Sequence, residues 1–144
     1  MKNLVVRSAR SFDAAEVANI SRRPFAARWS REAYAAEAER ADSIFLVADD
    51  GTARGYAVAR VFDAEARLLD MAVLVDGLGV GRALWAGLLS RARARAAAKL
   101  SLEVSSANAR ARSFYARVGA KVVGRRPKFY NDGSDAILMD LPLE

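Results

Sequence analysis

Apolar runs of strand length predict three strands in the first half of the chain. Residues 3–8 alternate between apolar and polar and are rich in Val, while residues 44–48 and 55–61 are nearly continuous apolar runs. Residues 49–52, between the last two runs, contain Asp and Gly, which supply the backbone geometry of a tight turn. The sequence therefore predicts an opening strand and, further along, a β-hairpin.

Two short helices are expected between the opening strand and the hairpin. Glu16 follows Asp13 by three residues, which is the spacing of a capping box, so we expect a helix with Asp13 as its N-cap. A second helix is expected from about Ser30 to about Arg40.

The middle of the chain combines a strand, a glycine-rich turn and a helix. Residues 68–75 form an apolar run of strand length. Gly occupies every second position of residues 77–81, and residues 82–99 have helical composition. The apolar residues of this helix share one arc: Leu84, Trp85, Leu88, Leu89 and Ala92. A glycine turn lets backbone N–H groups approach an anion, and a helix N-terminus adds about half a positive charge. A phosphate site is therefore predicted, with an ordinary tight turn as the alternative, because neither a dinucleotide fingerprint nor a P-loop is complete.

The last third predicts three more strands, one before and two after a helix. Residues 100–105 alternate strictly, which places Glu103 on the less apolar face of a strand. Asn108 is a suitable N-cap for a helix that ends near Gly119. Residues 122–123 and 136–139 resemble closing strands on either side of a basic loop. Helices on a mostly antiparallel sheet make the expected fold mixed α and β.

Glu103 and Tyr115 are candidate acid–base residues, and each has a simpler interpretation. A carboxylate on the polar face of a strand is commonly a solvent-facing group. On the last helix, Phe114 and Val118 are expected in the core, and Tyr115 is offset from Phe114 by about 100°. That offset leaves its hydroxyl free to face a polar group.

The residue types that are missing exclude several kinds of chemistry. The chain contains no Cys, which excludes disulfides, a thiol nucleophile and cysteine-ligated metals. It also contains no His, which excludes a Ser-His-Asp triad and removes the commonest metal ligand. An acid or base must therefore come from Asp, Glu, Lys, Tyr or a chain terminus.

Length and composition indicate one soluble domain over residues 1–144. Hydrophobic residues make up 53% and charged residues 28% of the chain, and no apolar run approaches the roughly 18 residues of a membrane span. The first residues lack the apolar run of a signal peptide, so a cytoplasmic location is expected. The net charge of +6 favours a polyanionic partner, such as nucleic acid, a ribosome surface or a phosphate-bearing cofactor.

Six motifs, taken in order and spacing, resemble those of the GNAT superfamily, and specifically the RimI-type ribosomal-protein alanine N-acetyltransferases. They cover nearly the whole chain, with echoes of the family's first helices at Pro24-Phe25 and Trp29-Ser30. The six are Leu69-Asp-Met-Ala-Val73, Gly79-Val-Gly-Arg-Ala-Leu84, Leu102-Glu-Val-x-x-x-Asn108, Phe114-Tyr-x-x-x-Gly119, Gly124-Arg-Arg-Pro127 and Asp135-Ala-Ile-Leu-Met139.

The resemblance implies the fold and the reaction. The fold would be α+β, a three-layer α/β/α arrangement with a mixed, mostly antiparallel sheet of about seven strands and about four helices. The reaction would be transfer of the acetyl group of acetyl-CoA to a primary amine by direct transfer in a ternary complex, with no metal. The expected acceptor is the N-terminal α-amine of a protein, with a small-subunit ribosomal protein as the expected substrate and no membrane or direct nucleic-acid partner.

The resemblance also implies the site residues. Glu103 matches the general base, and Tyr115 matches the acid that protonates the departing thiolate. The cofactor would be held at Met71, Ala72, Val73, Gly79, Val80, Gly81, Arg82 and Asn108.

The chain departs from the family pattern at several positions, and other functions stay open. Asp76-Gly77-Leu78 occupies a shortened phosphate loop, where a carboxylate would repel the pyrophosphate. Ser105, Ala120 and the segment Lys128-Phe129-Tyr130 also differ from the usual residues, so substrate choice is expected to differ too. The alternatives are acetylation of a small-molecule amine or a lysine, and a non-catalytic basic module that binds ribosome or nucleic acid.

Overall fold

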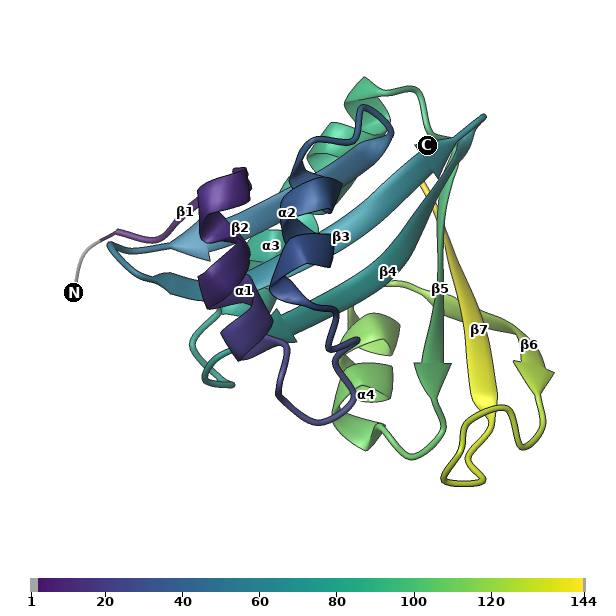
Figure 1. Ribbon diagram of the computed structural model, residues 1–144. Coiled ribbons are helices and arrows are strands. Elements are labelled where there is room, and N and C mark those ends of the chain that lie inside the picture. The colour runs from purple at the N-terminus through teal and green to yellow at the C-terminus, as the bar shows by residue number, and fades with distance from the viewer. Residues whose placement is uncertain (1–2, 144) are drawn as a thin grey trace.

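The computed structural model describes residues 3–143, which form a seven-stranded sheet between two layers of helices (Figure 1). The predicted α+β, three-layer architecture is confirmed. The strands are β1 (Val5–Ser8), β2 (Ser43–Asp49), β3 (Ala53–Phe62), β4 (Glu65–Val73), β5 (Lys99–Ser105), β6 (Lys121–Arg126) and β7 (Ala136–Pro142). The helices are α1 (Ala14–Ile20), α2 (Arg31–Ala38), α3 (Val80–Ala94) and α4 (Ala109–Arg117).

The sheet has the order β1-β2-β3-β4-β5-β7-β6, and β4 and β5 are its parallel pair. Their pairing covers only Glu65–Arg67 against Lys99–Ser101. Beyond these residues the two strands diverge, as the ribbon of Figure 1 shows. The backbone edge of β4 that follows Arg67 therefore has no strand partner across the gap, and the gap opens a space in the middle of the sheet.

Apolar residues pack on both faces of the sheet. The larger cluster joins the buried faces of α3 and α4 to one face, with Leu84, Leu88 and Leu100 fully buried. The smaller cluster joins α1 and α2 to the other face of β2, β3 and β4.

A β-bulge in β4 reverses which residues face each layer. Ala59 pairs with Leu68 and Val58 pairs with Asp70, so Leu69 is the extra residue. Before the bulge, Ala66 and Leu68 pack in the α3 cluster; after it, Asp70 points toward α1 and α2. The bulge thus places a carboxylate on the face that α1 and α2 partly cover.

Asp13 occupies the N-cap position of α1, as predicted, but the capping bond expected from its side chain is not made. Asp13 ends a 3-10 turn and makes no side-chain capping bond to α1. Its carboxylate accepts hydrogen bonds from both terminal nitrogens of Arg7, at 2.8 and 2.9 Å, and from the backbone N–H of Arg10. Bonds from Arg7 of β1 and from the backbone of Arg10 therefore take the place of the capping bond that the spacing indicates.

The predicted bounds of the long helix are also wrong at both ends. α3 starts at Val80, two residues before the expected position, and ends at Ala94, five residues before the expected Lys99. Ala96 adopts a left-handed conformation with φ of 62°, and Ala97 N–H donates to the carbonyl of Ala92. This is a Schellman ending built on Ala instead of Gly, so no Gly marks it in the sequence. The predicted hairpin, the cap of α2 at Ser30 and the cap of α4 at Asn108 are confirmed.

Candidate active site

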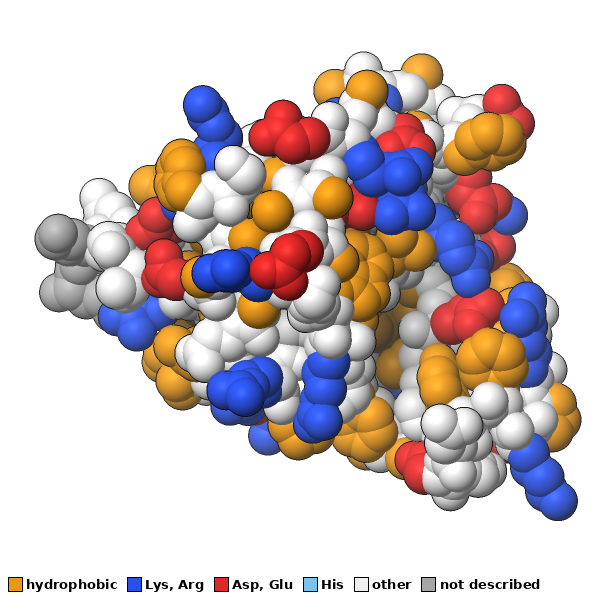
Figure 2. Space-filling model, viewed as in Figure 1, with side chains coloured by type: hydrophobic (Ala, Val, Ile, Leu, Met, Phe, Trp, Pro, Cys, Tyr) orange, Lys and Arg blue, Asp and Glu red, His pale blue; other side chains and the backbone are white. Residues whose placement is uncertain are grey.

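The divergence of β4 and β5 opens a pocket of about 460 Å³. Figure 2 shows it as a hollow with apolar walls and charged side chains on its rim. β4 and β5 supply two walls; the α1–α2 connection, the start of α4 and the β6–β7 loop supply the rest. The lining residues are Phe25, Ala26, Ala27, Leu68, Leu69, Asp70, Met71, Glu103, Val104, Ser105, Asn108, Ala111, Tyr115, Tyr130, Asn131 and Asp132.

The pocket brings together four of the residues that the sequence analysis selected. Met71 lies on β4, Glu103 on β5, and Asn108 and Tyr115 at the cap and in the body of α4. The other six candidates, Ala72, Val73, Gly79, Val80, Gly81 and Arg82, do not line it. Those six residues lie at the end of β4, at the N-cap of α3 and in the first turn of α3, and so follow the pocket residue Met71 in the sequence.

Glu103 is an ion-paired carboxylate, and the interpretation as a solvent-facing group is wrong. Its side chain is 16% exposed, and its Oε1 lies 2.7 Å from a terminal nitrogen of Arg67 and 3.7 Å from one of Arg126. Arg67 comes from β4 and Arg126 from β6, on opposite sides of β5. Two guanidinium groups thus hold the carboxylate at the pocket.

Tyr115 is more deeply buried than its helical offset indicates. The residue is 9% exposed, and its ring packs against Trp85 at 5.6 Å between ring centres. Phe114 and Val118, expected in the core, are only partly buried at its edge. Burial raises the pKa of the Tyr115 hydroxyl above its ordinary value, and the charge of Asp70 raises it further. The hydroxyl therefore stays protonated at neutral pH and is able to donate a proton.

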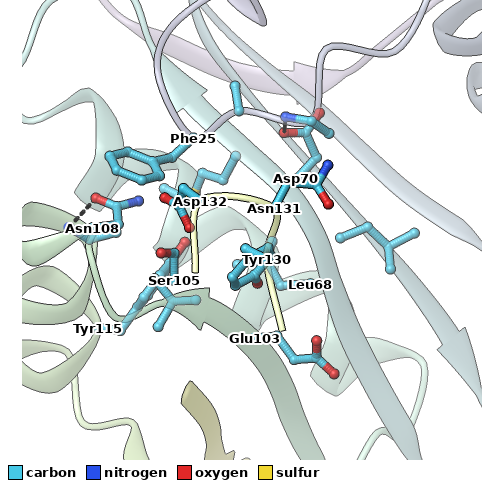
Figure 3. Close-up of a pocket in the computed structure, with 16 residues that line it drawn as sticks. Phe25, Leu68, Asp70, Glu103, Ser105, Asn108, Tyr115, Tyr130, Asn131 and Asp132 are labelled. Atoms are coloured by element: carbon cyan, nitrogen blue, oxygen red, sulfur yellow. Dashed lines mark hydrogen bonds between the residues drawn. The ribbon is translucent and has the colours of Figure 1, made fainter. Parts of the chain in front are cut away.

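Asn108 joins the cap of α4 to the pocket. Its side-chain oxygen accepts a hydrogen bond of 3.2 Å from the backbone N–H of Ala111. This bond fixes the amide, and its nitrogen is turned toward the interior of the pocket (Figure 3). A donor is therefore held at a fixed place by the helix that carries Tyr115.

The glycine turn before α3 has the form of an anion site. Gly79, the N-cap of α3, has a φ of 79°, and a Cβ at Gly77 or Gly79 would meet no atom within 4 Å. The turn is therefore open on its outer side, next to the N–H groups of the first turn of α3. Val80 contributes only backbone there, because its side chain is buried in the core. These features fit the phosphates of a CoA molecule.

Asp76, expected to repel phosphate, is paired with two arginines. Its Oδ2 lies 3.4 Å from a terminal nitrogen of Arg23 and 3.5 Å from Nε of Arg110. Arg23 belongs to the α1–α2 connection and Arg110 to the first turn of α4. Their charges offset the carboxylate at the edge of the phosphate turn.

Asp70 is the pocket residue that the sequence analysis missed. It is 5% exposed, and burial raises the pKa of its carboxyl group above the ordinary value of 3.8, against opposing hydrogen bonds from Tyr34, Ala27 and Tyr56. A single carboxylate within the apolar run of residues 68–75 was the available signal. In Figure 3, Asp70 and Glu103 project from neighbouring strands that border the same pocket.

The chain belongs to the acetyltransferase (GNAT) family, whose model matches residues 14–120. It is accordingly an acetyl-CoA-dependent N-acetyltransferase. No curated protein matches the chain.

Solved structures extend the match to nearly the full length. The ribosomal-protein-S18-alanine N-acetyltransferase of Escherichia coli is 30% identical, with a TM-score of 0.87, over 99% of this chain and 95% of that chain. Ard1 of Thermoplasma volcanium is 26% identical, with a TM-score of 0.88, over 96% and 97%. A nourseothricin acetyltransferase is 34% identical, with a TM-score of 0.67, over 72% and 67%.

Among residues 3–143, no group of three or more Asp or Glu side chains is arranged to hold a metal ion. Within the same range, every helix is too short or too polar to cross a membrane.

Proposed function

We propose that the chain, acting as one domain over residues 1–144, acetylates the N-terminal α-amine of a protein. The observation that carries the proposal is the pocket between β4 and β5, which collects Met71, Glu103, Asn108 and Tyr115. The similarity to the S18-alanine N-acetyltransferase over almost the whole chain supports the same choice of acceptor. A small-subunit ribosomal protein is the proposed substrate.

Glu103 is the proposed general base. A free α-amine has a pKa of about 7.7–8.0, so it is mostly protonated at neutral pH and must lose a proton before it attacks a thioester. The carboxylate of Glu103 takes that proton directly or through water. Arg67 and Arg126 keep the carboxylate oriented.

Tyr115 is the proposed general acid. The thiolate that leaves when the C–S bond breaks needs a proton, and the Tyr115 hydroxyl lines the same pocket. A phenol has a pKa of about 10, so the hydroxyl carries a proton at neutral pH, and burial, which raises that pKa, keeps it protonated until the thiolate accepts the proton. The tetrahedral adduct of the amine therefore collapses to the amide and the free thiol without an acyl-enzyme, which a chain without Cys cannot form as a thioester.

The donor would be held along β4 and the start of α3. Acetyl-CoA supplies the activated acetyl group, and the free backbone edge at Met71, Ala72 and Val73 would accommodate its acyl and pantetheine part. The backbone of Gly79, Val80, Gly81 and Arg82 would bind the pyrophosphate through unpaired N–H groups. Asn108 would donate to the pantetheine part from the cap of α4.

Release of the thiol of CoA with a small set of acceptors tests the proposal. The acceptors are short peptides that differ only in their first residue, the same peptides with a blocked N-terminus and an internal Lys, and nourseothricin. Release that requires a free N-terminus and prefers Ala supports the proposal. Release only with nourseothricin or only with Lys would replace it with the second candidate, acetylation of a small amine or a lysine, which the nourseothricin acetyltransferase match favours.

A further inference from the structure

We infer that Asp70 is a positioning residue that holds the segment between α1 and α2 in the shape that forms the acceptor side of the pocket. The inference rests on the proposed function for its kinetic consequence, although its structural part is tested separately. The segment covers residues 21–30, and its Phe25, Ala26 and Ala27 line the pocket.

The Asp70 carboxylate binds three donors that all belong to the layer of α1 and α2 or to the strand beneath it. Oδ1 accepts a hydrogen bond of 3.0 Å from the backbone N–H of Ala27. Oδ2 accepts bonds of 2.5 Å from the Tyr34 hydroxyl and 2.8 Å from the Tyr56 hydroxyl. Tyr34 lies on α2 and Tyr56 on β3, so one carboxylate connects β3, β4, α2 and the segment.

A second backbone group of the segment joins the same network through Ser21. The backbone N–H of Arg28 donates to Ser21 Oγ at 2.7 Å, and Ser21 Oγ lies 2.6 Å from the Tyr34 hydroxyl. An ionised carboxylate only accepts, so Tyr34 donates to Asp70 and Ser21 donates to Tyr34. Asp70 therefore sets which group donates and which accepts in the hydrogen bonds that join Ser21, Tyr34 and Asp70.

The conformation of the segment requires such support. Phe25 has a φ of 69° and Arg28 a φ of 58°, in the left-handed region that residues with a Cβ avoid. The two N–H groups that the network binds, at Ala27 and Arg28, lie beside or at these positions. Without the network, the segment would relax toward ordinary backbone angles and move the pocket wall that includes Phe25.

Asp70 also precedes Met71, where the proposed donor site begins. The segment has other anchors nearer its start, since a terminal nitrogen of Arg23 donates to the Leu74 carbonyl at 2.9 Å. Within the segment, the backbone N–H of Ala26 donates to the Arg23 carbonyl and the Arg28 side chain to the Arg22 carbonyl, but these bonds do not connect the segment to the sheet, as the Asp70 network does. Loss of Asp70 should therefore weaken acceptor binding while acetyl-CoA binding, proposed for the segment from Met71 to Arg82, persists.

The test uses the full chain with Asp70→Asn, whose side-chain nitrogen cannot accept from Tyr34 and Tyr56. The matched control is Glu37→Gln, which changes another buried carboxylate, 3% exposed and bonded to Arg60. Ser21→Ala and Tyr34→Phe each remove one hydroxyl of the network. They replace Asp70→Asn in the same measurements if that variant does not fold.

Trypsin cleavage of the folded protein after Arg22 and Arg28, followed by mass spectrometry, reads the segment directly. We expect cleavage about tenfold faster in Asp70→Asn, the effect of about one lost hydrogen bond, and little change in Glu37→Gln. In kinetics, the KM for the acceptor should rise about tenfold, with kcat and the Kd for acetyl-CoA changed less than about threefold.

The outcomes separate this inference from the proposed function. Faster cleavage with no acetylation of any peptide would support the positioning role and overturn the proposed acceptor. Cleavage and acceptor KM that match the Glu37→Gln control would overturn the positioning role, whatever the acceptor is. A rise in the Kd for acetyl-CoA equal to the rise in acceptor KM would also overturn it, because the effect would then be general to the fold.

Discussion

Asp70 and Glu103 are two carboxylates on neighbouring strands, and they line one pocket in opposite surroundings. Asp70 is buried and bonded to two hydroxyls and one backbone N–H, all neutral donors. Glu103 is part-exposed and paired with two guanidinium groups, whose side chains are themselves 44% and 54% exposed. The same chemical group is therefore fixed inside the fold on β4 and held at the surface of the pocket on β5.

The difference shows which carboxylate is free to react. The acceptor positions of Asp70 are occupied by donors that the fold holds in place, so a substrate proton has little access to it. The partners of Glu103 reach solvent, and exposed ion pairs exchange at a cost of about 1 kcal/mol or less. Burial with neutral donors suits a positioning role, and exchangeable ion pairs suit proton transfer.

The largest expected effect is on catalysis by Glu103. Glu103→Gln keeps the shape of the side chain but cannot take a proton, so kcat should fall about 100-fold or more while the Kd for acetyl-CoA stays within about twofold. Steady-state thiol release and calorimetric titration measure the two quantities. Glu65→Gln is the control, because Glu65 is an exposed carboxylate at the β4–β5 junction outside the pocket lining. Equal losses in both variants would remove Glu103 from the role of base.

The second-largest expected effect is on stability, where the substitution of Asp70 should matter more than that of Glu103. Asp70→Asn places an amide donor against the hydroxyls of Tyr34 and Tyr56, so the free energy of unfolding should fall by about 1–3 kcal/mol. Glu103→Gln should change it by less than about 1 kcal/mol, since it weakens only exposed ion pairs. Urea denaturation followed by circular dichroism measures both. A larger loss in Glu103→Gln would contradict the contrast between the two sites.

The sequence predicted those parts of this comparison that depend on local spacing. The alternation of residues 100–105 placed Glu103 on the polar face of β5, and the caps at Ser30 and Asn108 were found from side chains that bond within three residues. The ion pairs of Glu103 were not predictable, because Arg67 and Arg126 reach it only through the strand order. The N-cap position of Asp13 was predicted correctly, but its ion pair was not, because its partner Arg7 comes from β1.

Asp70 escaped prediction because of the bulge at Leu69. Counting alternate residues from Ala66 and Leu68 places Asp70 in the core against α3, among apolar side chains. One extra residue turns it to the opposite face, beside Tyr34 and Tyr56. The end of α3 was missed for a related reason, because the chain reverses at Ala96 without a Gly. Both features are irregularities of the backbone that the residue types at those positions do not predict.

A third carboxylate, Asp76, extends the comparison to the donor side with a smaller effect. It resembles Glu103 in having two exposed arginine partners. Arg110→Gln should leave its charge partly uncompensated and raise the Kd for CoA about two- to fivefold, the range of an exposed ion pair. Titration calorimetry at low and high salt measures this change.

The double variant distinguishes two roles of Arg110. If Arg110 acts by offsetting Asp76, then Asp76→Asn added to Arg110→Gln should restore the Kd to within about twofold of the parent. A Kd that stays raised in the double variant would mean that Arg110 binds the phosphates itself. Either variant should leave the free energy of unfolding within about 1 kcal/mol of the parent, as expected for exposed pairs.

The smallest expected effect is the pH dependence that Asp70 gives to stability. Burial raises the pKa of Asp70 above 3.8, although hydrogen bonds from Tyr34 and Ala27 oppose the rise. An acid with a higher pKa in the folded state stabilises the fold below the unfolded pKa, and that contribution is lost as the pH rises through the folded value. Asp70→Asn has no such loss, so the gap in free energy of unfolding between parent and variant should narrow as the pH rises from the ordinary value of 3.8 through the raised pKa of Asp70. Urea denaturation at several pH values measures the gap, and a constant gap would mean that the Asp70 carboxylate ionises as readily in the fold as in the unfolded chain.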